Sequence, residues 1–515
     1  MPRYVAGLDI GGSRTKAVIL DDSGRIVGRG YHGYPMRHRA LGQAEHDAET
    51  WWIAAVNALR QALIDVPASE VDAIGVSCTN GLVAVDHHGT PLRPAIMLWD
   101  QRSRSAAHRV ARVIGTEAVS EVTGNPVAPG TYSLPIIVWL QEQEPQTLDA
   151  AHAFLVPGGF IVQRLTGEFT IDYSRACTTL LFDIRALRWH DPFLHALAIP
   201  PRLLPRPLPS GTVAGTVTAD AAAITGLRPG VPVIAGCMDT VAAAIGSGVV
   251  EPGHAFAIIG TAARVASVLD TAAFDLRFMH CTFLEPARWL TIGAINGAGA
   301  AVTWSRRVFA MRGEAAPSAG RAQEDSFPDV TAVPAGSRGL VFLPYLAGER
   351  TPVWDADARG AWVGLTLSHD RGDLFRSILE GAAYAIRQSV QLLEETRGSS
   401  VSDLRVSGGG ARSPVWMRIL VDVLGMPLVT LAEPDTEPLG AAMLAAVSVR
   451  QFPSMEAAVA RVVTPVDRIV PDPVAHASYN KMFTVYTELY PTLKSLFLRM
   501  GMSDTPETEG QACDR

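Results

Sequence analysis

Two strand–turn–strand segments that lie far apart in the 515-residue chain constrain its fold more than any other feature. YVAGLDIGGSRTKAVIL (4–20) places two apolar runs around a glycine turn, and GHAFAIIGTAARVASVL (253–269) repeats the pattern with Gly260 and Thr261 at its bend. The repetition predicts a duplicated architecture with a boundary near 247–252. A chain of this length also exceeds what one hydrophobic core supports, which favours two large domains.

The first of these hairpins has a composition that suits an anion. Gly11 and Gly12 leave the turn backbone bare, so that its N–H groups can point at a phosphate. Lys16 adds a positive charge, and Asp9 could hold a magnesium ion through water. A plain hairpin turn with a solvated lysine is the alternative, and this segment alone leaves both open.

Charge and composition exclude several classes of protein. The net charge of −7 disfavours nucleic acid or an anionic membrane as the main partner. Apolar runs fall short of the ~18–20 residues that a membrane helix needs, and the N-terminus lacks a signal-peptide pattern. The five cysteines are scattered without CxxC pairs, so we expect a reducing, cytoplasmic setting and no zinc site.

Hydrophobic periodicity locates the main elements. We expect strands at 25–31, 71–77, 82–86 and 231–236, and helices at 47–64 and 240–248. Asp47 is the expected N-cap of its helix, and the proline-rich segment 199–211 is expected to be extended rather than helical. Residues 312–338 have the composition of a surface loop, and a helical segment is expected at 476–500.

Two further segments could carry chemistry. GCMDT (236–240) places Asp239 between a strand and a helix, where it could act as an N-cap or as a general base. LRVSGGGARSPVWMRILVDVL (404–424) runs from a strand through three glycines to Ser413 and Pro414, an expected N-cap and first helical residue. The glycines would let a flat ring lie against the backbone; an ordinary strand-to-helix turn is the alternative.

The block 343–390 combines a polar loop with a long helix. Its second half predicts a helix from about Gly372, and its first half carries Glu349, Arg350, Asp357 and Arg359. These charges fit a loop folded into a cleft, although a self-paired surface loop has the same composition.

Together these stretches resemble the FGGY carbohydrate kinase family, with most similarity to its xylulose kinase-like branch, over nearly all of residues 4–447. The most specific match is GLTLSHDRGDLFRSILE (364–380), which follows PYLAGERTPVWD. The resemblance implies an α/β fold of two ribonuclease-H-like (actin-like ATPase) domains with ATP and sugar in a central cleft between them. The implied domains are 1–248 and 249–450, followed by a helical extension at 451–500 and a polar, disordered tail at 501–515.

The resemblance also implies roles for individual residues. Asp239 matches the catalytic base, and Asp9 matches the acid associated with Mg²⁺. Residues that match the nucleotide-binding turns are Gly11, Gly12, Ser13, Thr15 and Lys16 in the first hairpin, Gly260 and Thr261 in the second, and Gly299, Gly409, Gly410 and Ala411 near adenosine.

This sequence departs from the family pattern at the substrate side. Gly12 stands where most relatives have threonine, so a hydroxyl contact to phosphate is expected to be missing unless Ser13 or Thr15 supplies it. SCTNG (77–81) lacks the histidine of xylulose kinases, which weighs against xylulose itself. The expected sugar-facing residues are Thr79, Asn80, Trp99, Asp100 and Arg102. A packed tryptophan and a capping aspartate are the alternatives for Trp99 and Asp100.

The leading hypothesis is an ATP- and Mg²⁺-dependent kinase for a small sugar, ketose or polyol, with Asp239 deprotonating the acceptor hydroxyl. The alternatives are a kinase for ribulose, gluconate or an autoinducer-like compound, an actin-like ATPase switch, and a non-catalytic sugar or ATP sensor. Exposed apolar helix faces leave room for a homodimer.

Overall fold

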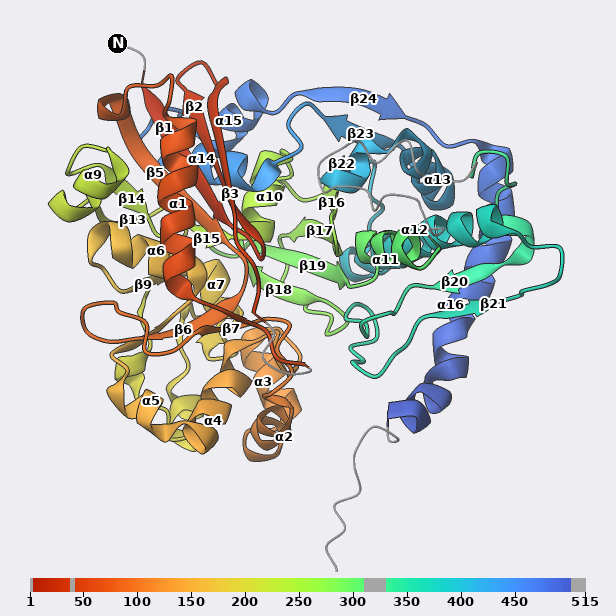
Figure 1. Ribbon diagram of the computed structural model, residues 1–515, viewed down its shortest axis with the longest axis horizontal. Helices are drawn as coiled ribbons and strands as arrows, with labels where there is room; N and C mark the ends of the chain where they lie inside the picture. Colours follow the sequence, from red (N-terminus) through yellow and green to blue (C-terminus); the bar gives the residue numbers. More distant parts are fainter. Residues whose placement is uncertain (1–2, 38–41, 310–329, 502–515) are drawn as a thin grey trace, which may run out of the picture.

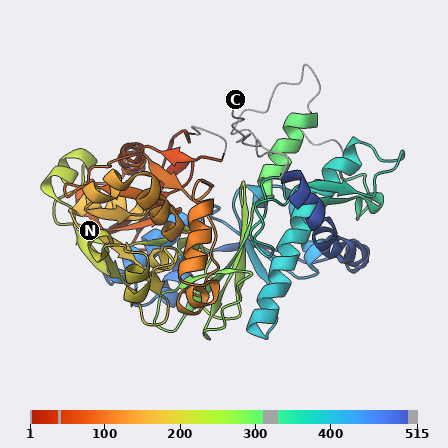
Figure 2. The same ribbon diagram turned by 90° about the horizontal axis from the view of Figure 1, so that it is seen from below.

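The computed structural model describes residues 3–37, 42–309 and 330–501, which form two α/β lobes. Figure 1 shows the first lobe mostly in red to yellow-green, with the blue helices α14 (Thr436–Ser448) and α15 (Met455–Val462) among its elements, and the second lobe in green to blue. Seen from below, the lobes lie side by side with the green strands of the second lobe facing the first (Figure 2).

A seven-stranded sheet forms the centre of the first lobe. β1 pairs antiparallel with β2 and parallel with β5, and β2 pairs antiparallel with β3. On its other side β5 pairs parallel with β14. The strands in spatial order are β13 (Val213–Thr216), β14 (Pro232–Ile234), β5 (Val71–Cys78), β1 (Tyr4–Ile10), β2 (Arg14–Asp21) and β3 (Ile26–Gly33), with β15 (Cys237–Met238) also on β5.

The second lobe repeats this pattern. β16 pairs antiparallel with β17 and parallel with β22, and β17 pairs antiparallel with β19. On its other side β22 pairs parallel with β23. The seven strands in order are β18 (Met279–Thr282), β19 (Trp289–Ile295), β17 (Ala263–Leu269), β16 (Ala255–Ile259), β22 (Leu404–Ser407), β23 (Leu428–Leu431) and β24 (Pro465–Ile469). The predicted duplication is therefore a duplication of sheet topology.

Glycines let two helices approach the first sheet closely. Helix α1 (Ala48–Ala62) covers β2 and β3, where a Cβ on Gly30 would lie 1.8 Å from the Ala58 carbonyl oxygen. Helix α14 (Thr436–Ser448) packs on β1 and β5, where a Cβ on Gly7 would lie 2.0 Å from the Pro438 oxygen. In Figure 1 the blue helix α14 passes behind the strands that α1 covers. Only glycine permits these backbone contacts.

Helices α10 (Asp239–Gly246) and α14 form the closest helix pair around the site. A Cβ on Gly440 would lie 1.8 Å from the Ala242 oxygen, and one on Gly246 would lie 2.0 Å from the Thr436 oxygen. Leu439, Met443 and the following helix α15 (Met455–Val462) contribute to the first lobe's core although they come late in the sequence. The chain thus returns to the first lobe before it ends.

Helix α12 (Arg371–Arg397) is the long helix of the second lobe. Asp370 and Asp373 form a capping box at its N-terminus, and Gly398 in the left-handed conformation ends it. Helix α13 (Pro414–Leu424) has Ser413 as its N-cap and Pro414 at its first position. Helix α16 (Pro473–Gly501) packs on α13 and α12.

The remaining elements connect these parts. The helices are α2 (Arg104–Val113), α3 (Thr116–Thr123), α4 (Ser133–Gln143), α5 (Pro145–Ala150), α6 (Pro157–Thr166), α7 (Tyr173–Cys177), α8 (Asp191–Ala196), α9 (Ala219–Thr225) and α11 (Gly299–Phe309). The short strands are β4 (Glu45–His46), β6 (Gly81–Val85), β7 (Ala95–Met97), β8 (Ala153–Leu155), β9 (Thr170–Asp172), β10 (Phe182–Asp183), β11 (Arg188–Trp189), β12 (Arg206–Leu208), β20 (Val341–Leu343) and β21 (Ala361–Val363). Four 3₁₀ turns lie at Ala68–Glu70, Pro201–Leu203, Ser337–Gly339 and Gly409–Arg412 within the described residues.

Most predicted elements are present, with two differences. Asp239 is not an N-cap, because Met238 precedes the helix and Asp239 is its first residue. The segment 199–211 is not wholly extended, since it contains a 3₁₀ turn before β12. The expected surface loop at 312–338 and tail at 501–515 lie mostly outside the described residues. Over the ranges that the structure describes, every helix is too short or too polar to cross a bilayer.

Candidate active site

A cavity of about 770 Å³ lies between the lobes. The first lobe lines it with Asp9, Gly11, Gly12, Ser13, Lys16, Thr79, Trp99 and Asp239, among others. The second half of the chain contributes Gly260, Thr261, Arg264, Asn296, Ala300, Glu349, Arg350 and Glu437. Both glycine hairpins therefore meet at one cavity, and ten of the eighteen residues predicted for the site line it.

Asp239, at the start of α10, has both carboxylate oxygens occupied. Oδ1 accepts from Nη2 of Arg175 at 3.1 Å and from the Thr240 amide at 2.8 Å. Oδ2 lies 2.9 Å from Nη2 of Arg264, which belongs to β17 of the other lobe. Burial alone would raise the pKa of Asp239, but Arg264 and then Arg175 lower it below its usual value. The carboxylate is thus ionised at neutral pH.

Asp9, at the end of β1, has the opposite electrostatic environment. It is buried, and its Oδ1 accepts a hydrogen bond from Ser77 Oγ at 2.9 Å. Burial, followed by the charge of Glu437, raises the pKa of Asp9 to about 7. A carboxylate held this way gains from a nearby cation, because the cation offsets both burial and the repulsion from Glu437.

The carbonyl groups of the first hairpin are held from outside the cavity. Tyr34 donates its hydroxyl to the Gly11 oxygen at 2.7 Å, and Nε2 of His46 lies 2.8 Å from the Gly12 oxygen. The turn itself closes with a bond from the Gly11 amide to the Arg14 oxygen at 3.0 Å. These bonds fix the bend at the cavity surface.

Lys16 contacts acidic residues at the start of α14. Its Nζ lies 2.9 Å from Asp435 Oδ1 and 3.2 Å from Glu437 Oε2. Burial lowers the pKa of Lys16, but Glu437, Asp9 and Asp435 raise it well above its usual value. The Lys16 side chain lines the cavity, yet it also links β2 to the segment that enters α14.

Trp99 explains why residue 12 has no side chain. A Cβ built on Gly12 would lie 2.5 Å from Cη2 of the indole, so a threonine has no room in this arrangement. Trp99 is 42% exposed and lines the cavity. The departure from the family pattern at Gly12 therefore goes together with an adjacent indole that occupies the space of the missing side chain.

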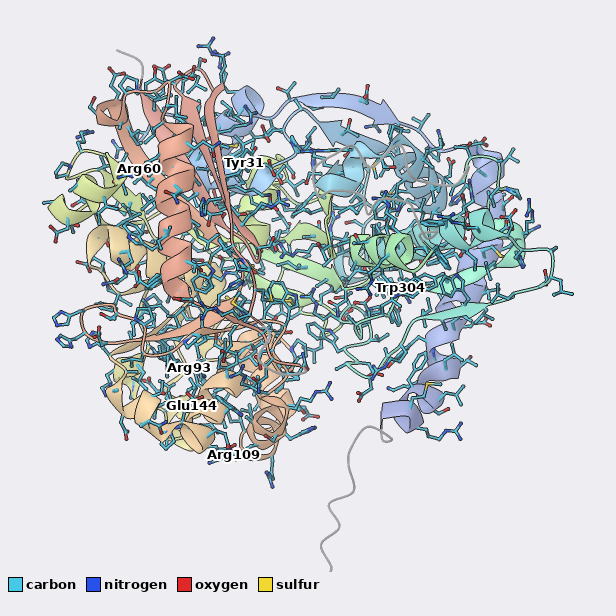
Figure 3. The ribbon with its side chains drawn as sticks, in the orientation of Figure 1. Tyr31, Arg60, Arg93, Arg109, Glu144 and Trp304 are labelled. Atoms are coloured by element: carbon cyan, nitrogen blue, oxygen red, sulfur yellow. The ribbon has the colours of Figure 1, made fainter. Side chains whose placement is uncertain are left out.

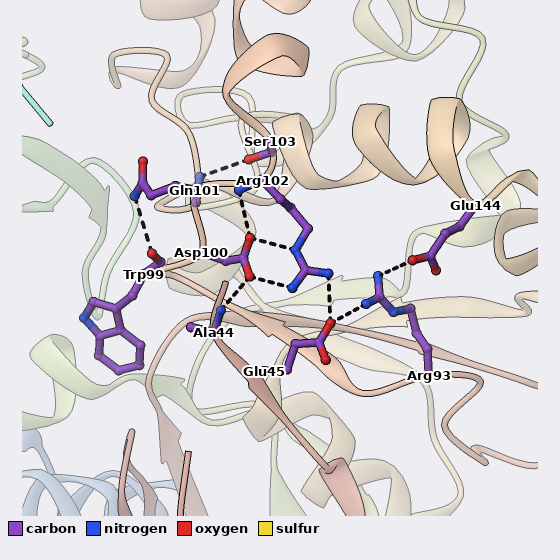
Figure 4. A network of polar contacts seen from close by, with 10 residues as sticks. Ala44, Glu45, Arg93, Trp99, Asp100, Gln101, Arg102, Ser103 and Glu144 are labelled. Atoms are coloured by element: carbon purple, nitrogen blue, oxygen red, sulfur yellow. Dashed lines mark hydrogen bonds and ion pairs between the residues drawn. The ribbon is translucent and has the colours of Figure 1, made fainter. Parts of the chain in front are cut away.

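Asp100 and Arg102 are not among the residues that line the cavity. They belong to a network of polar contacts next to Trp99 (Figure 4). Asp100 is fully buried, and its Oδ2 accepts from the Ala44 amide at 2.7 Å and from Arg102 Nη2 at 2.8 Å. Arg102 Nη1 lies 2.8 Å from Glu45, which also contacts Arg93 at 2.7 Å. This network fixes the backbone next to Trp99. Figure 3 places Arg93 and Glu144, its other partner, in the lower part of the first lobe.

Thr79, Asn80 and Thr15 differ in their access to the cavity. Thr79 lines it, whereas Asn80 is buried and donates from Nδ2 to the oxygen of Thr131 at 2.6 Å. Thr15 is fully buried with its hydroxyl 3.5 Å from that of Tyr34. Of the two residues expected to replace a missing hydroxyl, Ser13 lines the cavity and Thr15 does not.

The predicted adenosine turns lie next to the second hairpin. A Cβ on Gly299 would lie 2.2 Å from the Gly260 oxygen, and the Ala300 amide donates to Thr261 at 2.7 Å. Gly410 packs on Ile259, where a Cβ would lie 2.4 Å from Cγ2, whereas a Cβ on Gly409 would meet open space. Gly409 and Ala411 lie in the 3₁₀ turn after β22, which is paired with β16. Segments near 260, 299 and 410 thus converge.

The polar loop before α12 reaches the cavity, as predicted for Glu349 and Arg350. Glu349 is buried and accepts from the amides of Asn296 and Arg350 at 2.7 and 2.8 Å. Burial raises the pKa of Glu349 to about 7. Burial and the nearby Arg264 lower the pKa of Arg350 to about 10. Asp357 pairs instead with Arg104 of the first lobe at 3.7 Å.

Arg175, Arg264 and Glu437 were not predicted from the sequence. Arg264 carries a visible signal, since it is the one charged residue within the strand ARVASVL. Its neighbours Ala263 and Val265 face the core, so strand alternation points Arg264 the other way, into the cavity. Arg175 lies 64 residues from Asp239 and has no comparable local signal.

The carboxylates of the cavity suit a magnesium ion. Asp9, Asp239 and Glu437 line the same space, and hard oxygen donors are what Mg²⁺ prefers. Among the described residues, no cluster of three His, Cys, Asp or Glu side chains is close enough to hold a metal alone. A bound ion would therefore need water and phosphate oxygens to complete its shell, which is typical of kinase sites.

Comparison with known proteins identifies the family. Residues 4–246 match the N-terminal domain model of the FGGY family of carbohydrate kinases, and residues 240–449 match its C-terminal domain model. Among curated proteins, the xylulose kinase of Bacillus subtilis is 29% identical over 499 residues, which is 96% of this chain and 98% of that protein. The gluconokinase of the same organism is 27% identical over 506 residues, with 97% and 98% covered.

Solved structures agree in fold. The xylulose kinase of Rhodospirillum rubrum superposes with a TM-score of 0.85 at 32% identity, covering 96% of this chain and all of that one. The gluconate kinase of Lactobacillus acidophilus gives a TM-score of 0.88 at 24% identity over 97% of this chain. The expected α/β fold with two ribonuclease-H-like (actin-like ATPase) domains is confirmed. The chain belongs to the FGGY family of carbohydrate kinases and is a carbohydrate kinase.

Proposed function

We propose that this kinase transfers the γ-phosphoryl group of Mg²⁺-ATP to a hydroxyl of a small sugar, ketose or polyol, with Asp239 as the general base. One observation carries the proposal: an ionised aspartate lines the same cavity as the bends of both hairpins. Phosphoryl transfer needs little more than positioned groups and compensated charge.

The chain's own residues divide the work. Backbone N–H groups of Gly12 and Thr261 bind phosphate oxygens, because these bends carry little side-chain bulk. The amides of Gly11 and Gly260 instead close the two turns by internal hydrogen bonds. Asp239 orients the acceptor hydroxyl and takes its proton at a carboxylate oxygen. Thr79 and Trp99 face the sugar, while Asp100 and Arg102 position the Trp99 segment.

Magnesium fits the donor set of the cavity. Asp9 would hold the ion through water. Its pKa is raised to about 7 by burial and by Glu437, so a bound cation would stabilise its charged form. When bound, the ion supplies positive charge that stabilises the triphosphate and the leaving ADP. Removing divalent metal is expected to abolish turnover, and an Asp9→Asn variant is expected to need at least about tenfold more Mg²⁺.

A ketose or polyol of the xylulose or ribulose type is the first candidate substrate, since the xylulose kinase of Bacillus subtilis is 29% identical over nearly its whole length. Gluconate is the second candidate. Arg350 lines the cavity near Asp239 and offers positive charge to a carboxylate, and a gluconokinase is 27% identical.

A panel of ketoses, polyols and sugar acids, with ADP release as the readout, tests the proposal. We expect at least one of these compounds to raise ADP release well above the ATPase rate measured without acceptor. Release that no polyhydroxy compound stimulates would instead favour a sensor, and the proposed function would be wrong.

A further inference from the structure

The two arginines that pair with Asp239 differ in their freedom to leave it. Arg175 comes from α7 of the same lobe, is 1% exposed and contacts Oδ1. Arg264 comes from β17 of the opposite lobe, its side chain is 28% exposed, and it contacts Oδ2 at 2.9 Å. Only Arg264 lines the cavity.

This pairing shields the carboxylate from a substrate hydroxyl. Oδ1 is bound by Arg175 and by the Thr240 amide, and the one remaining site on Oδ2 lies beside the positive charge of Arg264, which weakens that oxygen as a proton acceptor. An unshielded proton acceptor requires that one oxygen be released from its ion pair. Oδ2 is the one that can be, because its partner is on the cavity surface and on the other lobe.

Arg264 stands next to the second hairpin. It follows the bend at Gly260 and Thr261 by three residues and pairs with Ile258 across the hairpin. Asp239 is the one ion-pair partner that Arg264 has among the described residues, and Arg350 lies close enough to repel it. An anion at the bend therefore competes directly with Asp239 for this guanidinium.

We propose that Arg264 moves from Asp239 to the γ-phosphoryl group when ATP binds, and that it is a catalytic residue which frees the base as it stabilises the transferring group. The proposal rests on the proposed function. The planar guanidinium suits phosphate oxygens, and a positioned arginine contributes about 10³–10⁵-fold to phosphoryl transfer in GTPases.

The transfer exchanges one phosphorus–oxygen bond for another. The acceptor hydroxyl oxygen forms a bond to the γ-phosphorus, and its proton passes to Oδ2 of Asp239. The bond between the γ-phosphorus and the bridging oxygen breaks, and ADP leaves with that electron pair. Arg264 donates hydrogen bonds to equatorial oxygens of the moving group and forms no covalent bond.

The arrangement also couples the two substrates. Without ATP, Arg264 holds the lobes together and keeps Asp239 from acting on a bound sugar. With ATP, the guanidinium leaves and the base is exposed only when a phosphoryl group is present to receive the hydroxyl. This order of events follows from one cation having two anionic partners.

Nucleotide binding tests the proposal even in an inactive variant. We expect Arg264→Gln to weaken binding of the non-hydrolysable ATP analogue AMP-PNP by about tenfold or more relative to ADP, because only the analogue carries a γ-phosphate. An unchanged ratio of the two dissociation constants would overturn the proposal. A thermal melt confirms that the variant is folded before binding is measured.

Turnover gives the second test. Arg264→Gln is expected to lower kcat at least about 100-fold with the sugar KM within about threefold, and Arg264→Lys is expected to recover part of the loss. A kcat equal to or above that of the wild type would mean that Arg264 only masks the base, which would overturn the proposal.

A matched control separates this role from a general contact between lobes. Arg104 of the first lobe pairs with Asp357 of the second at 3.7 Å and lines the same cavity without touching Asp239. Arg104→Gln removes an interlobe ion pair of the same kind and is expected to leave the ratio for AMP-PNP and ADP unchanged. Equal effects of both variants would contradict the proposal. A wild-type chain that binds AMP-PNP but phosphorylates nothing would count against the proposed function instead.

Discussion

The indole of Trp99 lies so close to Gly12 that a Cβ on Gly12 would meet Cη2 at 2.5 Å. The two residues belong to different segments of the first lobe, the first glycine hairpin and the loop after β7, and they meet at the cavity. The missing threonine of the first hairpin is therefore matched to the position of an aromatic ring.

Replacing Gly12 by threonine is expected to lower kcat/KM for ATP by about tenfold or more, because either the hairpin or the indole must shift from its place. Trp99→Leu in the same chain should recover part of that loss, and a double-mutant cycle in steady-state kinetics measures the coupling. If Gly12→Thr performs as well as the wild type, the indole does not constrain the hairpin.

Removing Arg102 is expected to destabilise the fold. Arg102→Met leaves the buried Asp100 carboxylate without its ion-pair partner and removes one of the two arginines that contact Glu45. Breaking comparable buried pairs costs about 3–5 kcal/mol. Urea unfolding measures the change. Arg104→Met, at a more exposed neighbouring site, serves as the control and should cost about 1 kcal/mol or less. A stable Arg102→Met protein with a raised sugar KM would assign Arg102 to substrate contact instead.

Glu349 makes stability depend on pH. Burial raises the pKa of Glu349 from 4.5 to about 7, so the folded chain binds this proton more tightly than the unfolded chain does. Its contribution to stability is complete below pH 4.5 and is lost as pH rises through about 7. When the pH is raised from about 5 to about 8, the Tm of Glu349→Gln should therefore fall less than the Tm of the wild type. Other buried carboxylates are common to both proteins, and parallel Tm curves would contradict this assignment.

Helix α14 depends on glycine at position 440. Gly440→Ala would place a methyl group 1.8 Å from the Ala242 oxygen of α10, and forced overpacking of this kind costs at least about 1–3 kcal/mol. Gly33→Ala is a suitable control, because the nearest atom to its Cβ would be the Ser13 oxygen at 3.8 Å. Denaturant unfolding should separate the two variants clearly, and equal stability would mean that α10 and α14 can move apart.

Features with a local cause were predictable from the sequence. Asp47 and Ser413 cap their helices through their own side chains. The second hairpin bends at Gly260 and Thr261, between β16 and β17, where the glycine turn predicts it. The helix stripe Trp51, Ala55, Leu59 and Ala62 is buried as its spacing predicts. In each case a few neighbouring residues determine the result.

Contacts between distant segments were not predictable in the same way. The pairing of Asp239 with Arg264 joins two lobes, and the return of α14 to the first lobe depends on backbone contacts at Gly7 and Gly440. The hydrogen bond that Tyr31, labelled in Figure 3, donates to Asp435 at 3.1 Å also joins segments far apart in the sequence. Such contacts depend on the arrangement of sheets, for which a single sequence carries no periodic signal.

Asp239→Asn provides the most direct test of the account, measured by rapid-quench phosphoryl transfer together with equilibrium binding of ATP and of the best acceptor. We predict that transfer falls at least about 10³-fold because the proton acceptor is lost, while the acceptor binds within about threefold of the wild type. ATP should bind at least as tightly as in the wild type, because the neutral amide competes less for Arg264. Asp239→Glu, which retains the charge in a longer side chain, should fall between the two. Transfer by Asp239→Asn within about tenfold of the wild type would contradict the assignment of Asp239 as the base.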